Sequence, residues 1–293
     1  MSIFSSVEEL LSECEKRDIP LWQLVMEYSS RESGISQEKS WGEMLRRLEA
    51  MRAADASYEP EQHSRSGLSG GDAAKLERYY RSGKSISGEF IGEILASALR
   101  MGECNACMHR IVAAPTAGAC GVMPAVLLPY AAKYACPDER LVEALFAAAG
   151  FGAVIATRAS ISGAEAGCQA EIGSASAMSA AALVYLHGGS ARQMAQAVAI
   201  ALKNMMGLVC DPVAGLVEVP CVKRNAAGAM NALSAAELAL AGIESRIPAD
   251  EVIDAMRAVG EALPAALRET GRGGVAASPT AMAFREKFFG QQA

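Results

Sequence analysis

The sequence predicts an all-α protein: a compact, Ala- and Gly-rich helical domain with cysteine-bearing loops between its helices. Three observations support this prediction. Apolar residues recur at helical spacing in one segment after another, and no extended apolar–polar alternation competes with that pattern, although the short apolar run 110–114 could form a strand. Finally, 51% of the residues are apolar but only 5% are aromatic, so small side chains must fill the core.

The helical pattern begins in the N-terminal part of the chain. Apolar residues recur between Val7 and Leu11 and again between Leu21 and Val25, on either side of a break at Pro20. The stretch 56–75 is rich in Pro, Ser and Gly, which is typical of a functional loop or linker. We therefore expect an N-terminal helical segment, 1–62, followed by a larger helical domain, 63–293, that carries the functional loops.

The larger domain contains further helical segments of similar length. The loops between them are unusually rich in Gly, Ser, Thr, Pro and Cys. The sequence predicts helices over 73–81, 87–101, 121–134, 138–156, 175–187, 191–203, 225–241 and 249–263.

Composition and charge disfavour several classes of protein. The net charge of -6 and the pI near 5.3, with no basic stripe, argue against nucleic-acid binding. The N-terminus has no basic start followed by an apolar segment, so it does not resemble a signal peptide, and we expect a cytoplasmic protein. The longest apolar run, 144–156, is too short to cross a bilayer, so we expect no membrane span.

The sequence contains eight cysteines, which are unlikely to form a disulfide framework in a reducing compartment. Five of them give little evidence of a function. Cys14 and Cys136 lie in or beside amphipathic segments, Cys104 and Cys107 form an isolated C-x-x-C, and Cys120 lies in a Gly-rich turn. The three histidines do not have the spacing of a zinc site.

The remaining three cysteines lie in two loops. Cys168 falls within 158–177, a long polar interruption between apolar segments, and long loops in compact domains are usually functional. Cys210 and Cys221 lie in the Pro- and Gly-broken stretch 207–225. Three thiolates with an open fourth position suit a substrate-binding iron–sulfur cluster, whose exposed iron acts as a Lewis acid. A closed structural zinc site would need a fourth protein ligand.

These loops resemble those of a known family. The stretches "IVAAPTAGACGVMPAVL", "SGAEAGCQAEIGSASAMSAAALV" and "LKNMMGLVCDPVAGLVEVPCVKRNAAGAMNA" look like the alpha chain of the iron–sulfur-dependent bacterial L-serine dehydratases. "SGLSGGDAAKL" and "GRGGVAASPTA" fit the same family, so the resemblance covers most of the chain from about residue 64 onward.

The resemblance implies an oxygen-sensitive [4Fe-4S] enzyme that converts L-serine to pyruvate and ammonia without pyridoxal phosphate. It also implies that Cys168, Cys210 and Cys221 are the cluster ligands. The Ser-Ser-His-Thr motif of single-chain members does not occur here, which implies a separate beta chain; the isolated alpha chain could form a homodimer. The C-terminal cysteine that approaches the cluster in some single-chain members has no counterpart in the ending "FFGQQA".

For this reaction we expect five residues beside the loops to bind the substrate: Thr116, Ala117, Gly118, Arg224 and Asn225. The turn over 116–118 offers backbone N–H groups near a helix N-terminus, which suit a carboxylate. Lys203 and Asn204 could orient substrate or move a proton. The structural alternatives are that Lys203 caps a helix C-terminus and that Arg224 pairs with Glu218. We interpret Glu171 as a helix cap, and the sequence does not identify the general base.

Three alternatives remain open. A pyridoxal-phosphate lyase could run the same net reaction, but it would need a Schiff-base lysine, usually with a phosphate cup in a mixed α/β fold. A related iron–sulfur lyase could act on cysteine or on another small hydroxy acid. A non-enzymatic subunit could use the cysteines to hold a structural zinc.

Overall fold

The computed structural model describes residues 4–290 and confirms the all-α prediction. All regular secondary structure in this range is helical, and β pairing is limited to one isolated bridge between Cys210 and Arg268. The run 110–114, which could have formed a strand, is irregular.

Three helices form the N-terminal part of the molecule: α1 (Val7–Arg17), α2 (Leu21–Ser33) and α3 (Gln37–Ala56). Ser6 caps α1 and Ser36 caps α3, each by accepting a hydrogen bond from a backbone N–H in the first turn. Leu24 of α2 belongs to the same hydrophobic cluster as Phe146 and Phe151, so this part packs directly on the main core. The division of the chain at residue 62 stays a prediction.

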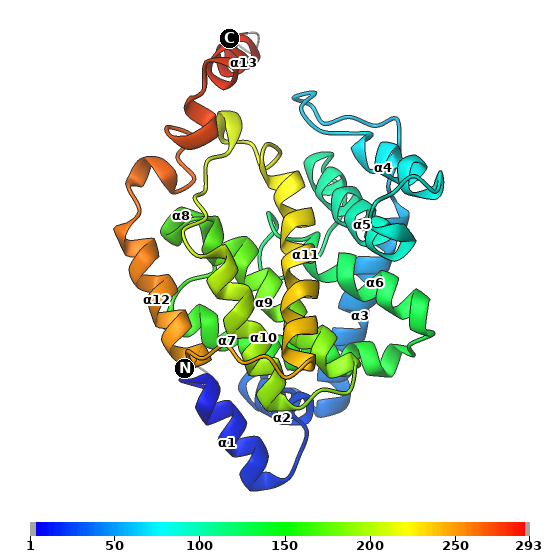
Figure 1. Cartoon of the computed structure of the whole chain (residues 1–293), viewed down its shortest axis with the longest axis vertical. Helices are drawn as coiled ribbons and strands as arrows, with labels where there is room; N and C mark the ends of the chain where they lie inside the picture. Colours follow the sequence, from blue (N-terminus) through cyan, green and yellow to red (C-terminus); the bar gives the residue numbers. More distant parts are fainter. Residues whose placement is uncertain (1–3, 291–293) are drawn as a thin grey trace.

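The centre of the fold is α9 (Cys168–Leu186), which lies against α7 (Asp138–Arg158), α10 (Ala191–Met205) and α11 (Cys221–Leu240) (Figure 1). Of its 19 residues, 17 are buried. Small residues set the distances between these helices: a Cβ added at Gly228 would lie 2.9 Å from Cγ2 of Ile172. The Ala- and Gly-rich composition is therefore explained by close helix packing.

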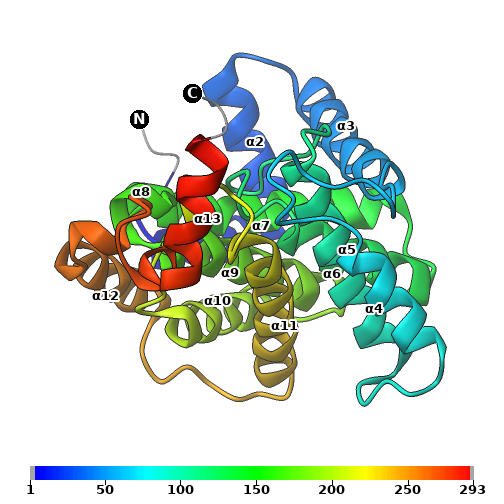
Figure 2. The ribbon, with the colours of Figure 1, turned by 90° about the horizontal axis from the view of Figure 1, so that it is seen from above.

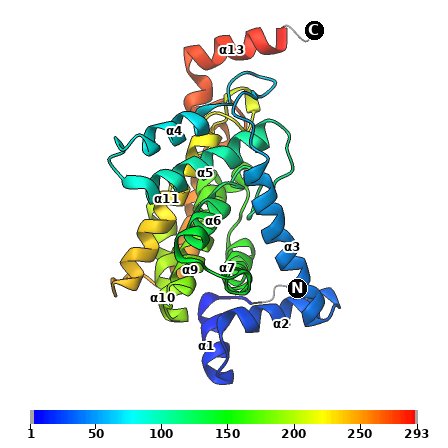
Figure 3. The ribbon, with the colours of Figure 1, turned by 90° about the vertical axis from the view of Figure 1, so that its right-hand side faces the viewer.

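The remaining helices surround this centre. They are α4 (Asp72–Arg81), α5 (Gly88–Ala106), α6 (Val122–Tyr134), the short α8 (Gly163–Ala166), α12 (Ala249–Ala262), α13 (Pro279–Gly290) and the 3₁₀ turns η1 (Val213–Gly215), η2 (Ala265–Leu267) and η3 (Gly274–Ala277). Helices α1 and α2 lie at the opposite end of the molecule from α13 (Figure 3). Figure 2 views the molecule from the α13 end.

Two helices begin earlier than the sequence predicts. α9 starts at Cys168 rather than at residue 175, and α11 starts at Cys221 rather than at residue 225. The polar stretch that suggested a loop is helical because its serines are buried between helices; Ser174 and Ser176 are both fully buried. Only Cys210 of the three predicted ligands lies in a loop.

Among the described residues, α7 is the one helix whose length and composition would suit a membrane span. Its apolar window is 67% buried inside the protein. Leu141, Phe146, Phe151 and Ile155 all belong to the main hydrophobic cluster. The apolar character of α7 is thus that of a core helix.

Candidate metal centre

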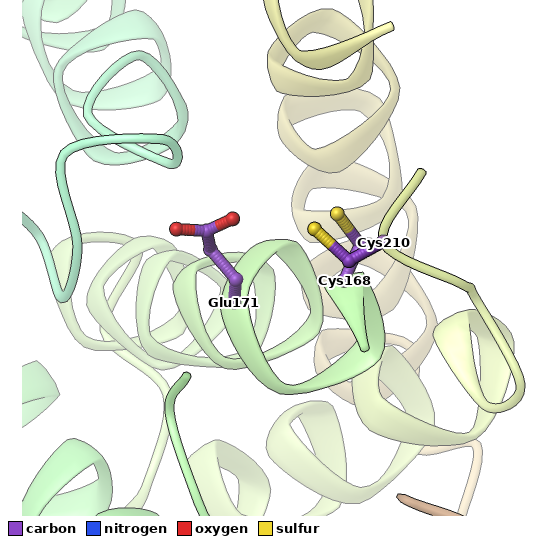
Figure 4. A group of neighbouring side chains, drawn as sticks. All are labelled: Cys168, Glu171 and Cys210. Atoms are coloured by element: carbon purple, nitrogen blue, oxygen red, sulfur yellow. The ribbon is translucent and has the colours of Figure 1, made fainter. Parts of the chain in front are cut away.

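Two of the predicted ligands lie side by side. The Sγ atoms of Cys168 and Cys210 and a carboxylate oxygen of Glu171 all lie within 4.8 Å of one another (Figure 4). Cys168 opens α9, Glu171 lies one turn further along the same helix, and Cys210 comes from the loop after α10. Both cysteines are buried. The group therefore joins a helix N-terminus to a loop across the interior.

The C-terminal part of the chain holds Cys210 in place. The backbone N–H of Cys210 donates to the carbonyl of Leu267 (2.9 Å), and the N–H of Glu269 donates to the carbonyl of Cys210 (2.7 Å). Glu269 has φ +63°, a left-handed conformation that is uncommon for residues other than glycine. This pairing brings the side chain of Glu269 to the edge of the site.

Cys221 lies nearby but outside the closest group. It is buried at the start of α11, and burial raises the pKa of its thiol to about 12. The charges of Cys168 and Glu171 act in the same direction, and that of Arg224 opposes them. The three cysteines thus share one buried region, with Cys168 and Cys210 closest together.

Cys168 is the more acidic thiol of the close pair. A hydrogen bond from Cys210 lowers the pKa of Cys168 against the opposing effect of burial, and the Arg224 guanidinium adds to the lowering. The same hydrogen bond, together with burial, raises the pKa of Cys210. A helix N-terminus also favours a thiolate, because its positive dipole end faces the sulfur. Buried cysteines, whose thiolates are soft donors, are suitable ligands for iron or zinc.

Arg224 is anchored within the site. One terminal nitrogen of its guanidinium group lies 3.5 Å from Sγ of Cys168 and donates to the carbonyl of Val209 (2.8 Å). The other lies 2.9 Å from Oδ1 of Asp211 in a buried ion pair. The alternative pairing of Arg224 with Glu218 is wrong; that carboxylate instead accepts hydrogen bonds from two serine hydroxyls, those of Ser64 and Ser66. A substrate-binding role for Arg224 stays a prediction.

Asn225 connects the Gly-rich turn to α11. Its amide nitrogen donates to the carbonyls of Gly118 (2.8 Å) and Cys221 (3.0 Å), and its Oδ1 accepts the N–H of Gly121 (2.8 Å). The residue is buried. Asn225 therefore fixes the position of the turn relative to Cys221.

The turn over 116–118 faces the metal centre. The hydroxyl of Thr116 donates to Glu171, and a Cβ added at Gly118 would lie 2.7 Å from Oε1 of Glu171. Ala117 is exposed and Gly118 is buried. Burial raises the pKa of the Glu171 carboxyl despite the hydrogen bond from Thr116. The structure thus brings the predicted substrate-binding turn and the cysteines together around Glu171, which is more than a helix cap.

Lys203 and Asn204 have partners elsewhere. The amine of Lys203 donates to the carbonyl of Ser245 (2.5 Å), and the amide of Asn204 donates to Asn231 (2.8 Å). Within residues 4–290, neither side chain bonds to the cysteines or to Glu171. Their predicted roles in the reaction stay predictions.

Three residues at the site were not found from the sequence: Asp211, Gly163 and Glu269. A Cβ added at Gly163 would lie 3.0 Å from Sγ of Cys210 and 3.4 Å from Oε2 of both Glu171 and Glu269. The bare backbone of Gly163 therefore lies against a sulfur and two carboxylates, at distances that leave little space for a side chain. The three free, buried thiols are donors of the type that the predicted cluster requires.

The fold and the site define an all-helical protein with a buried cysteine–carboxylate centre. The chain belongs to the family described as serine dehydratase alpha chain, whose sequence profile matches residues 16–276. This result confirms the resemblance predicted from the loop sequences.

Some similar proteins match this chain over almost their whole length, whereas others are longer and match it over about half of theirs. This chain is 50% identical to the probable L-serine dehydratase, alpha chain, of Bacillus subtilis. That alignment of 288 residues covers 98% of this chain and 96% of the relative. It is 42% identical over 287 residues to the L-serine dehydratase, alpha chain, of Peptoniphilus asaccharolyticus, which spans 98% of each. With L-serine dehydratase 1 of Escherichia coli the identity is 43% over 209 residues, 70% of this chain but 46% of the relative.

Proposed function

We propose that this chain is the alpha subunit of an L-serine dehydratase that converts L-serine to pyruvate and ammonia in the cytoplasm. One observation carries the proposal: the buried group of Cys168, Cys210 and Glu171, with Cys221 close by, in a chain that matches relatives named L-serine dehydratase, alpha chain, over almost their whole length.

We assign Cys168, Cys210 and Cys221 as the ligands of a [4Fe-4S] cluster. The three free, buried thiols support this assignment. When bound, an iron with an open coordination position supplies Lewis-acid chemistry for a hydroxyl leaving group. The proposal does not require pyridoxal phosphate.

The side chains around the cysteines would prepare the site for this chemistry. Arg224 and the start of α9 stabilise negative charge on Cys168, and Asp211 holds Arg224 in that position. The buried N–H of Gly118 bonds to none of the described residues, so it is available to the substrate carboxylate. Glu171 faces the same space and can hold or move a proton.

A beta chain would complete the enzyme. The full-length relatives are named as alpha chains, and more than half of the longer Escherichia coli relative lies outside the matched region. These facts support a partner that supplies the missing part. Purified alone, the alpha chain could instead form a homodimer.

The test is L-serine turnover by the assembled enzyme. The chain would be coexpressed with the beta chain of the same organism, purified without oxygen and assayed for pyruvate. We expect turnover for wild type and for Cys136→Ser, which replaces a partly exposed cysteine outside the site. Turnover should fall by at least about a hundredfold in Cys210→Ser. An iron-loaded wild-type complex that leaves L-serine unchanged would refute the proposal.

A further inference from the structure

A second carboxylate, that of Glu269, faces the metal centre. The Cβ position of Gly163 is 3.4 Å from Oε2 of Glu269, 3.4 Å from Oε2 of Glu171 and 3.0 Å from Sγ of Cys210. Both carboxylates therefore approach the same stretch of bare backbone, next to a predicted metal ligand. Glu171 is half-buried, whereas Glu269 is exposed.

The backbone holds Glu269 in this position. Its N–H bonds to the carbonyl of Cys210, whose own N–H bonds to Leu267. Its left-handed conformation would be relaxed for glycine and is disfavoured for glutamate. Strained residues of this kind occur at functional sites, where the surrounding structure over-determines them. The side chain of Glu269 is thus held beside the metal centre by backbone contacts that also position Cys210.

The charge of this pair is not compensated. Within the described part of the chain, Glu171 accepts a hydrogen bond from neutral Thr116, and neither Glu171 nor Glu269 forms an ion pair. The nearby cation, Arg224, is paired with Asp211 and bonded to Val209. Two neighbouring carboxylates without an ion-pair partner attract a positively charged group.

We propose that Glu269, with Glu171 behind it, binds the α-ammonium group of an amino-acid substrate and so selects amino acids over hydroxy acids of the same shape. This inference rests on the proposed function and specifies its substrate class. L-Serine carries an ammonium group, a carboxylate and a hydroxyl on neighbouring carbons. The ammonium group would bind the two glutamates, the carboxylate would bind the turn over 116–118, and the hydroxyl would face the cysteines.

The test compares two ligands that differ in one group. L-Alanine and L-lactate share a carboxylate and a methyl group, but only L-alanine carries an ammonium group. The assembled, iron-loaded enzyme would be assayed as wild type, Glu269→Gln and Glu261→Gln, a matched control that removes one exposed charge from α12. The measurements are kcat and KM for L-serine and the competitive inhibition constants of both ligands.

We expect Glu269→Gln to raise KM for L-serine and the inhibition constant of L-alanine by about tenfold or more, with kcat within about threefold of wild type, because one charge-assisted hydrogen bond is lost. The constant for L-lactate and all values for Glu261→Gln should stay near wild type. Equal weakening of L-alanine and L-lactate, or no change in either, would overturn the inference. If the glutamine variant loses iron, Glu269→Asp keeps the charge and should retain the preference for L-alanine.

Failure of the proposed function is a separate result. If the iron-loaded wild type does not convert L-serine, calorimetric titration with L-alanine and L-lactate still tests the ammonium site, because it needs no turnover. Tighter binding of L-alanine that is lost in Glu269→Gln would support the inference. Equal binding of the two ligands to wild type would refute it.

Discussion

The ion pair between Asp211 and Arg224 provides a quantitative test of the site's architecture. The side chain of Asp211 is 3% exposed and that of Arg224 is 16% exposed, and their nearest charged atoms lie 2.9 Å apart. Oδ2 of Asp211 also accepts the N–H of Val275 (2.7 Å), which ties η3 to the loop of Cys210. The substitution Asp211→Asn removes the charge but keeps the size of the side chain and an oxygen acceptor.

Removing one partner of a buried ion pair costs about 3–5 kcal/mol, because the other charge stays buried. Arg224 would keep its contacts with Val209 and Cys168 and has some access to solvent, so we expect about 2–3 kcal/mol. For a chain of this length that loss lowers Tm by about 4 °C. A matched surface control is Glu8→Gln, since Glu8 and its partner Arg192 are 61% and 49% exposed; we expect it to cost under about 1 kcal/mol.

Urea denaturation of the full chain, followed by circular dichroism in the presence of a metal chelator, measures both variants in the same background. The expected result is a clearly lower midpoint for Asp211→Asn than for Glu8→Gln, with similar slopes. Equal midpoints for the two variants would show that Arg224 is effectively solvated, and the description of a buried, pre-organised site would then be wrong.

Three further predictions concern the site and its surroundings. Gly163→Ala places a Cβ 3.0 Å from Sγ of Cys210, so we expect L-serine turnover to fall by at least about tenfold. Gly42→Ala, whose nearest neighbour would be 3.8 Å away, should leave turnover unchanged, and normal turnover in Gly163→Ala would count against the close contact at Cys210. Cys104→Ser and Cys107→Ser should keep full iron content by elemental analysis, because both thiols lie outside the metal centre; loss of iron would reopen a metal role for the C-x-x-C. A hydrogen bond from Arg52 lowers the pKa of Asp138 below its ordinary 3.8, so wild type should be more stable than Asp138→Asn by under about 1 kcal/mol at this exposed pair. This difference in unfolding free energy should be present above pH 3.8 and should disappear as the pH falls through the folded-state pKa. A difference that persists at about pH 2 in urea denaturation would contradict the role of Arg52.

The helices were predictable because their apolar spacing is a local property. The sequence predicted α6 as 121–134 and it spans Val122–Tyr134; α7 was predicted from residue 138 and begins at Asp138. Prediction failed where polar residues are buried. Ser174 and Ser176 suggested a loop, but they lie inside α9, where small hydroxyl side chains allow neighbouring helices to approach.

The candidate site was predictable in part for the same reason. The three cysteines were singled out by their Gly- and Pro-rich surroundings, and the structure gathers them in one buried region. Glu269 and Asp211 could not be found in this way. Each reaches the site through tertiary contacts, since Glu269 is placed by its backbone bond to Cys210 and Asp211 by its pairing with Arg224.

The most direct test of the central claim is the metal content of the chain purified without oxygen. Iron, acid-labile sulfide and zinc would be measured for wild type, for Cys168→Ser, Cys210→Ser and Cys221→Ser, and for Cys136→Ser as the matched control. We predict about four irons and four sulfides per chain in wild type and in the control, and loss of both in each of the other three variants. Stoichiometric zinc without sulfide, or iron that survives all three substitutions, would contradict the account.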